Sequence, residues 1–193
     1  YSLGIIIVII IVIHLISALT YDRRIQYLET SYQSPRIPKE LDGYVIALVS
    51  DTHELSPDKM QRIVAKMNAR QINLLLLGGD YAHNGGFWQT MEILSQTKTT
   101  DGIYGVDGNH DNAAEVFEAM RRYGIVPLDN AGLYLKPGFY LAGTADLWKR
   151  QADVVQAVKA AGQTDFVLLL SHNPDIAMRQ NSSKVDVLLS GHT

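Results

Sequence analysis

Residues 44–53 read YVIALVSDTH, an apolar run that ends in a serine, an aspartate and a histidine. A continuous apolar run of this kind is typical of a strand that is covered on both faces of a sheet. Asp51 and His53 are two positions apart, so on an extended backbone their side chains point the same way. The stretch therefore predicts a buried strand that carries two potential metal ligands at its end.

The same arrangement recurs along the chain, with apolar runs at residues 72–77, 102–106, 166–170 and 185–189. The polar segments that follow them are Gly78-Gly79-Asp80, Gly108-Asn109-His110-Asp111, Ser171-His172-Asn173 and Gly191-His192-Thr193. Asp51 to Asp80 and Asp80 to Asn109 are both 29 residues, the length of a β-α-β unit. Because ligands in open α/β sheets bind outside the carboxyl ends of strands, we expect these segments to converge.

Helices and short strands are predicted between these runs. Apolar spacing and helix-start residues indicate helices at about residues 57–70, 87–95 and 113–123. In the second half, turn residues separate short runs at 125–128, 133–135 and 139–142, which predicts a meander. Further helices are expected at about residues 150–161 and 174–179. The pattern favours a single α/β domain.

The polar segments supply carboxylate, amide and imidazole groups. The candidate metal ligands are Asp51, His53, Asp80, Asn109, His172 and His192. An oxygen and nitrogen set without thiolates suits divalent Mn, Fe, Zn or a similar ion. Two such ions would activate a water and clamp the oxygens of a phosphoryl group. His110 could stabilise charge or protonate the leaving oxygen, and Asp111 could orient His110 or cap the following helix.

In order along the chain, these motifs resemble those of calcineurin-like metallophosphoesterases, over about residues 44–193. The resemblance implies a four-layer α-β-β-α sandwich of two mixed sheets and a dinuclear hydrolase of phosphoesters, a phosphodiesterase or pyrophosphatase. It also implies that Asp51 and His53 hold one ion and that Asp80 bridges. Asn109, His172 and His192 would hold the second ion, with His110 and Asp111 as catalytic residues.

The fifth motif is shorter than the family pattern, which usually reads Gly-His-X-His. The sequence stops at Thr193, so we expect residues 43–193 to be a C-terminally incomplete domain with a weakened first metal site. A non-catalytic binding or scaffold protein, or an inactive fragment of the same fold, is the alternative function.

The N-terminal residues form a separate apolar segment. Residues 3–19 read LGIIIVIIIVIHLISAL, near the roughly 17–25 residues that cross a bilayer as a helix. This predicts a transmembrane anchor at residues 1–20 and a linker at 21–42, with a secretory signal as the alternative. The resemblance to a membrane-associated bacterial branch predicts a cell-membrane protein with a possible lipid-linked substrate. The side of the membrane stays open.

Composition excludes several other classes. The chain has 193 residues, a formal net charge of −3 and no cysteine, so disulfides and thiolate metal sites are excluded. Since no run of Lys or Arg is present, a nucleic-acid surface is not expected. Among the remaining polar residues, we interpret His83 as a solvated loop residue and Asp146 as a turn residue. Of the two tryptophans, Trp88 is the preferred substrate contact and Trp148 the less preferred one.

Overall fold

The computed structural model describes residues 2–21, 25–53, 55–81, 86–179 and 183–192. The chain divides into two compact units, Tyr1–Tyr32 and Gln33–Thr193. The second unit thus begins within the segment predicted to be a linker. There Arg36 forms an ion pair with Asp186, and Leu41 is buried at the end of a short 3-10 helix, η1 (Lys39–Leu41).

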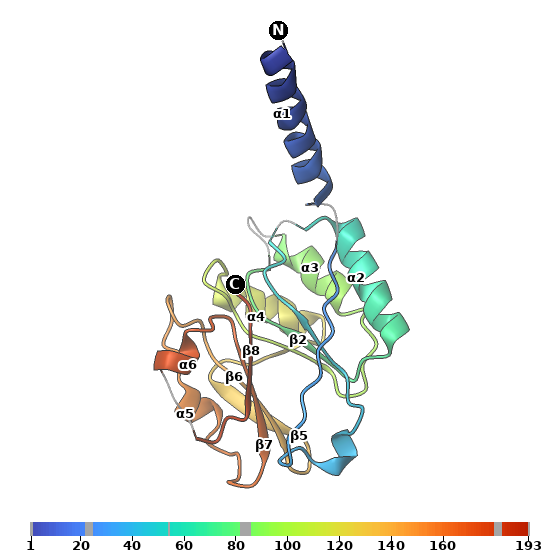
Figure 1. Ribbon diagram of the computed structural model, residues 1–193. Helices are drawn as coiled ribbons and strands as arrows, with labels where there is room; N and C mark the ends of the chain where they lie inside the picture. The colour runs from blue at the N-terminus through green and yellow to red at the C-terminus, as the bar shows by residue number, and fades with distance from the viewer. Residues whose placement is uncertain (1, 22–24, 54, 82–85, 180–182, 193) are drawn as a thin grey trace. The chain divides into compact units, whose positions relative to one another are not determined.

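The first unit contains the helix α1 (Ser2–Tyr21), which covers residues 2–20 of the predicted anchor (Figure 1). Within the part of the chain that the structure describes, no helix reaches the length and apolarity needed to cross a membrane. The anchor at residues 1–20 therefore stays a prediction.

The first sheet of the second unit has the strand order β1-β2-β3-β4 and is parallel at each pairing. Its strands are β1 (Ile46–Val49), β2 (Leu74–Leu77), β3 (Ile103–Gly105) and β4 (Val126–Pro127). The connecting helices are α2 (Pro57–Arg70), α3 (Phe87–Leu94) and α4 (Ala113–Arg122). A helical crossover returns the chain to the same edge, so successive strands run parallel. The expectation that this sheet is mixed was wrong for that reason.

The second sheet has the order β5-β6-β7-β8 and is mixed, as expected. Its strands are β5 (Ala131–Lys136), β6 (Phe139–Gly143), β7 (Phe166–Ser171) and β8 (Val187–Ser190). β5 and β6 form an antiparallel hairpin, whereas β6, β7 and β8 pair in parallel. The helices α5 (Val154–Ala157) and α6 (Ile176–Arg179) belong to this half.

Two predictions for the second half of the chain were wrong in detail. The expected meander is divided, because β4 pairs with β3 in the first sheet while β5 and β6 begin the second. The helix expected at 150–161 is only α5. Its start is fixed by Asp153, whose side chain accepts a hydrogen bond from the backbone N–H of Gln156, as an N-cap does.

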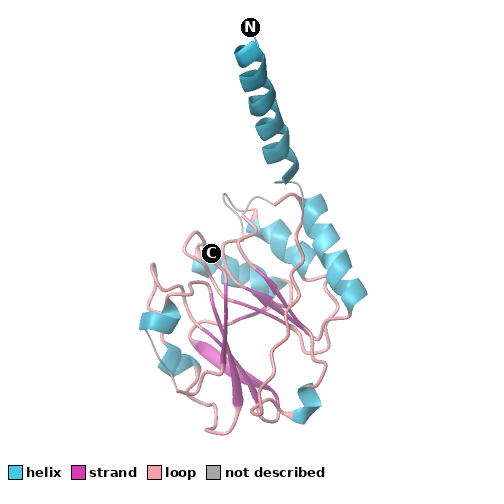
Figure 2. Ribbon diagram, viewed as in Figure 1, coloured by secondary structure: helices cyan, strands magenta, loops and turns pink. Residues whose placement is uncertain are grey.

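Successive side chains of the buried strands pack into different cores, which shows how the layers stack. Leu75 and Leu77 of β2 pack into a core with residues of α2, α3 and α4, whereas Leu74 and Leu76 pack into a core with residues of the second sheet. A third core lies between the second sheet and the helices α5 and α6. Three cores separate four layers, as Figure 2 shows with helices flanking the strands. The α-β-β-α sandwich is therefore confirmed.

Candidate metal centre

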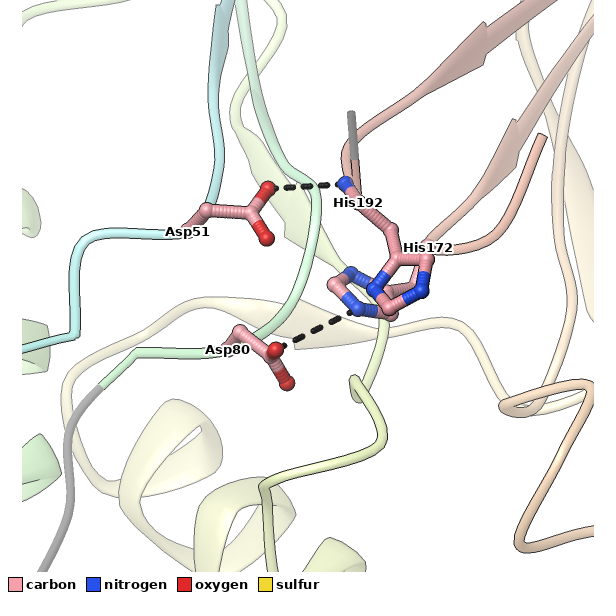
Figure 3. A group of neighbouring side chains, drawn as sticks. All are labelled: Asp51, Asp80, His172 and His192. Carbon is pink, nitrogen blue, oxygen red and sulfur yellow. Dashed lines mark hydrogen bonds and ion pairs between the residues drawn. The ribbon is translucent and has the colours of Figure 1, made fainter.

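The predicted ligands all follow strands, and the strands come from both sheets. Asp51 and Asp80 follow β1 and β2 of the first sheet, and His172 and His192 follow β7 and β8 of the second. Figure 3 shows the two carboxylates and the two imidazoles approaching one another from opposite sides. The sandwich therefore brings together groups that lie up to 141 positions apart in the chain.

These four side chains are close enough to share an ion. One ligand atom from each of Asp51, Asp80, His172 and His192 lies within 4.8 Å of the other three. Nε2 of His172 is 3.4 Å from Oδ2 of Asp80, and the two histidine rings are 5.0 Å apart between centroids. The arrangement has the composition of a site for a divalent cation.

His53 and Asn109 extend the same group. Nε2 of His53 is 3.8 Å from Oδ2 of Asp80, and Oδ1 of Asn109 is 3.0 Å from Nε2 of His172. The Asp80 carboxylate thus lies near imidazole nitrogens from two directions. All six ligands predicted from the sequence are brought together around it.

The backbone at the strand ends is unusual. Asp51, His53, Asp80 and His192 have φ values of 53°, 39°, 56° and 53°, in the left-handed region. Residues other than glycine adopt this region infrequently, at a cost of about 1–3 kcal/mol each, and such residues concentrate at functional sites. Gly79, at φ 96°, is required for space as well, because an added Cβ would lie 2.7 Å from Nδ1 of His172.

The protonation of His172 is set by its neighbours. Its Nδ1 lies 2.7 Å from the carbonyl oxygen of Gly78, which can only accept, so Nδ1 carries a proton. Nε2 then faces the oxygens of Asn109 and Asp80. The lone pairs on Nε2 of His172 and on the oxygens of Asn109 and Asp80 repel one another unless a proton or a cation lies between them. The donor set therefore fits a metal ion.

The pKa values agree with this geometry. Burial disfavours the charged imidazole, but the adjacent Asp80 and the Gly78 carbonyl outweigh it and raise the pKa of His172 to about 8. Burial likewise disfavours the charged carboxylate of Asp80, but the hydrogen bonds from His172 and from the His110 amide lower its pKa below the usual range. A proton on His172 thus balances the negative charge of the Asp80 carboxylate, as a bound metal ion would.

His110 and Asp111 lie beside this centre and have different surroundings. The backbone N–H of His110 donates to Oδ1 of Asp80 at 2.8 Å, and its exposed ring is 5.7 Å from the His53 ring. Asp111 accepts hydrogen bonds from three backbone amides, those of Asp80, Tyr81 and Gly108, at 2.8–3.1 Å. Asp111 therefore positions the loop of the central carboxylate. Its burial raises the pKa of the carboxyl group.

Three further residues lie at the centre; the sequence analysis missed Ser50 and Tyr81 and named Trp148 only as the less preferred substrate contact. The hydroxyl of Ser50 donates to Oδ2 of Asp51 at 2.5 Å. The hydroxyl of Tyr81, fully buried, accepts from the Gly79 amide at 3.1 Å and lies within hydrogen-bond distance of carbonyls at the ends of β2 and β3. Trp148 packs edge-on against His192. Only adjacency to Asp51 and Asp80 could have indicated the first two.

The remaining candidate residues from the sequence differ in where they lie. Trp88, the preferred substrate contact, is half-buried and packs against Phe87 and the core of the first sheet. Asp146 is buried in a turn after β6, where Oδ1 accepts from the backbone amides of Trp148 and Lys149. His83 lies outside the described residues.

A two-sheet α/β sandwich with aspartate, asparagine and histidine side chains at the strand ends defines the metallophosphoesterase class. Comparison with known families agrees, because the model of the calcineurin-like phosphoesterase family matches residues 44–193. The chain belongs to this family.

Curated relatives are similar over most of this chain. An uncharacterized metallophosphoesterase of Helicobacter pylori is 28% identical over 86% of this chain and 47% of its own length. The uncharacterized metallophosphoesterase YkuE of Bacillus subtilis is 25% identical over 88% and 64%. The phosphodiesterase YaeI of Escherichia coli is 32% identical over 63% and 48%. The chain therefore spans about half to two thirds of the length of these relatives.

Proposed function

We propose that the centre binds two divalent metal ions and hydrolyses phosphodiester or pyrophosphate bonds. The observation that carries the proposal is the convergence of six oxygen and nitrogen ligands from both sheets around Asp80. The family membership and the similarity to a protein named a phosphodiesterase support it. Mn, Fe and Zn are the ions that suit such a mixed ligand set.

The resemblance to the family implies how two ions would be held. Asp51 and His53 would hold the first ion, and Asp80 would bridge. The second ion would be held by Asn109, His172 and His192. When bound, a pair of ions supplies Lewis acidity toward phosphoryl oxygens and lowers the pKa of a coordinated water.

His110 is our candidate for the group that acts on the substrate. Its ring is exposed, whereas its backbone amide is fixed by the hydrogen bond to Asp80. A histidine held at the rim of the centre could donate a proton to the leaving oxygen or stabilise charge that develops on the phosphoryl group. Replacement of His110 by alanine should lower kcat about 100-fold or more, within the range for general acid–base catalysis, with metal binding retained.

The proposal is tested with bis(p-nitrophenyl) phosphate and added Mn²⁺. The purified protein should release p-nitrophenolate, and Asp80→Asn and His192→Ala should each remove most of this activity because both remove a ligand. Asp42→Asn is the matched control, since Asp42 is exposed at the end of η1 and is not near the centre's ligands. It should leave turnover unchanged.

Unchanged turnover in both ligand variants would contradict the proposal. Calorimetry with Mn²⁺ distinguishes the proposed hydrolase from the alternative function. Binding of Mn²⁺ by the wild type without turnover of any phosphodiester or pyrophosphate would favour a non-catalytic binding protein of the same fold.

Membrane attachment is a further part of the proposal. It is supported by the exposed apolar side chains of α1, such as Ile5 at 60% and Val12 at 45% exposure. Attachment would place the centre near lipid-linked phosphoesters. Cell fractionation should find the protein in the membrane pellet, released by detergent and not by high salt. Protease protection in vesicles would then identify the side of the membrane, and recovery in the soluble fraction would contradict attachment.

A further inference from the structure

Trp148 combines wide exposure with direct contact to a candidate metal ligand. It lies in the turn at residues 147–149 after β6, and 54% of its surface is exposed. Its ring centroid is 4.6 Å from that of His192, with an angle of 86° between the ring planes. A large apolar side chain therefore presents its surface to solvent at the edge of the centre.

The turn that carries Trp148 is fixed from both sides. Oδ1 of the buried Asp146 accepts hydrogen bonds from the amides of Trp148 and Lys149, at 3.0 Å and 2.7 Å. On the other side, the guanidinium of Arg150 pairs with Asp129 at 2.9 Å and lies 3.5 Å from Asp107. The backbone that carries the indole is thus fixed beside His192 before any substrate binds, which lowers the entropic cost of a contact.

A purely structural role explains this placement poorly. Large aromatic side chains that serve packing are mostly buried. An exposed indole on a fixed turn is instead well suited to pack against an apolar group of a ligand.

The position of Trp148 indicates which part of a substrate it would contact. Trp148 contacts His192, from the second sheet, whereas the exposed ring of His110 lies beside His53, from the first sheet. If His110 faces the leaving oxygen, Trp148 is a separate side chain that is available to the other substituent of the phosphorus.

We propose that Trp148 determines specificity by packing against an apolar non-leaving group of a phosphodiester. This inference rests on the proposed function of the centre. The apolar group could be a flat ring or an alkyl chain, and both would bury surface against the indole. Apolar character is therefore the property that Trp148 recognises. Experiment separates the ring from the alkyl chain.

The test uses three substrates that share the p-nitrophenyl leaving group and differ in the second substituent, which is methyl, phenyl or hexyl. The wild type should have a lower KM for the phenyl or hexyl ester than for the methyl ester. Trp148→Ala should raise that KM about three- to tenfold, the range expected for loss of one aromatic contact, with little change in kcat. A preference for phenyl alone identifies ring recognition, and a preference for both identifies general apolar contact.

Two controls separate specificity from structure. Trp148→Phe should keep most of the preference, and Met178→Ala, which removes an apolar side chain that is 85% exposed on α6, should change nothing. Calorimetry should give Trp148→Ala the same affinity for Mn²⁺ as the wild type. A loss of Mn²⁺ affinity with equal losses for all three esters would overturn the inference, because Trp148 would then only support His192.

A binding measurement keeps the inference separate from the proposed function. If no ester is hydrolysed, the proposed function fails, yet phenyl phosphate should still bind the Mn²⁺-loaded wild type more tightly than methyl phosphate. That difference should shrink in Trp148→Ala. An equal difference in wild type and variant would overturn the role of Trp148, whatever the outcome for turnover.

Discussion

The backbone N–H of His192 donates a 2.9 Å hydrogen bond to the carboxylate of Asp51. The bond joins the end of β8 in the second sheet to the end of β1 in the first. The hydroxyl of Ser50 donates to the same oxygen, Oδ2, from the first sheet. The orientation of a candidate ligand of the first ion therefore depends on how closely the two sheets approach at their carboxyl ends.

Gly191→Ala should disrupt this approach. A Cβ at residue 191 would lie 1.8 Å from Oγ of Ser50 and 2.5 Å from Oδ2 of Asp51, far inside van der Waals contact. The strand end must move, so we expect loss of Mn²⁺ affinity by at least tenfold and a lower melting temperature. Gly4→Ala is the control, because an added Cβ there meets nothing within 4 Å. Wild-type Mn²⁺ binding by Gly191→Ala would contradict the close approach.

Ser50→Ala tests the hydrogen bond itself. The substitution leaves Asp51 in place and removes one donor that orients it, so Mn²⁺ affinity should fall about 10-fold, the lower end of what loss of a supporting hydrogen bond causes. Titration calorimetry measures the affinity. Ser95→Ala is a suitable control, since the Ser95 hydroxyl donates to the Glu92 carbonyl at the C-terminal end of α3. Equal affinities for Ser50→Ala and Ser95→Ala would show that Asp51 is oriented by other contacts.

Much of the first sheet was predictable because its strands are buried on both faces. Short continuous apolar runs such as Leu74–Leu77 indicate buried strands in an α/β chain. The helix α2 begins and ends where its Pro57 and apolar spacing predict. The second half was less predictable, because short runs such as Val126–Pro127 carry no signal for which sheet they join. That choice is made by tertiary packing across the sandwich.

The candidate ligands were predictable, but the residues that support them were not. Asp80 and His172 follow buried strands, and that position alone places them at the sheet edge. The roles of Asp111, Tyr81 and Trp148 depend on contacts between loops that are far apart in sequence. No local pattern distinguishes a tryptophan that packs on a core, such as Trp88, from one that contacts a ligand.

Asp111→Asn should lower stability and metal affinity together. The substitution keeps the shape of the side chain but replaces an oxygen that accepts a backbone N–H with an amide group that cannot accept. One buried N–H then has no acceptor, at a cost of about 1–3 kcal/mol in the free energy of unfolding. Urea denaturation measures this cost, with Asp42→Asn as the control. A variant with wild-type stability and reduced kcat would instead favour a direct catalytic role for Asp111.

The metal-free protein should become less stable at alkaline pH, because the ion pair between His172 and Asp80 is lost there. The pKa of His172 is raised from 6.5 to about 8, so its proton stabilises the fold fully below about pH 6.5, and this stabilisation is lost as pH rises through 8. The difference between these two pKa values corresponds to about 2 kcal/mol. Urea denaturation in the presence of a chelator should show this decline between pH 6 and 9. Asp80→Asn removes the partner of His172 and should flatten the profile. A wild-type profile as flat as that of the variant would mean that His172 does not hold this proton, and that its nitrogen is already available to a metal ion at neutral pH.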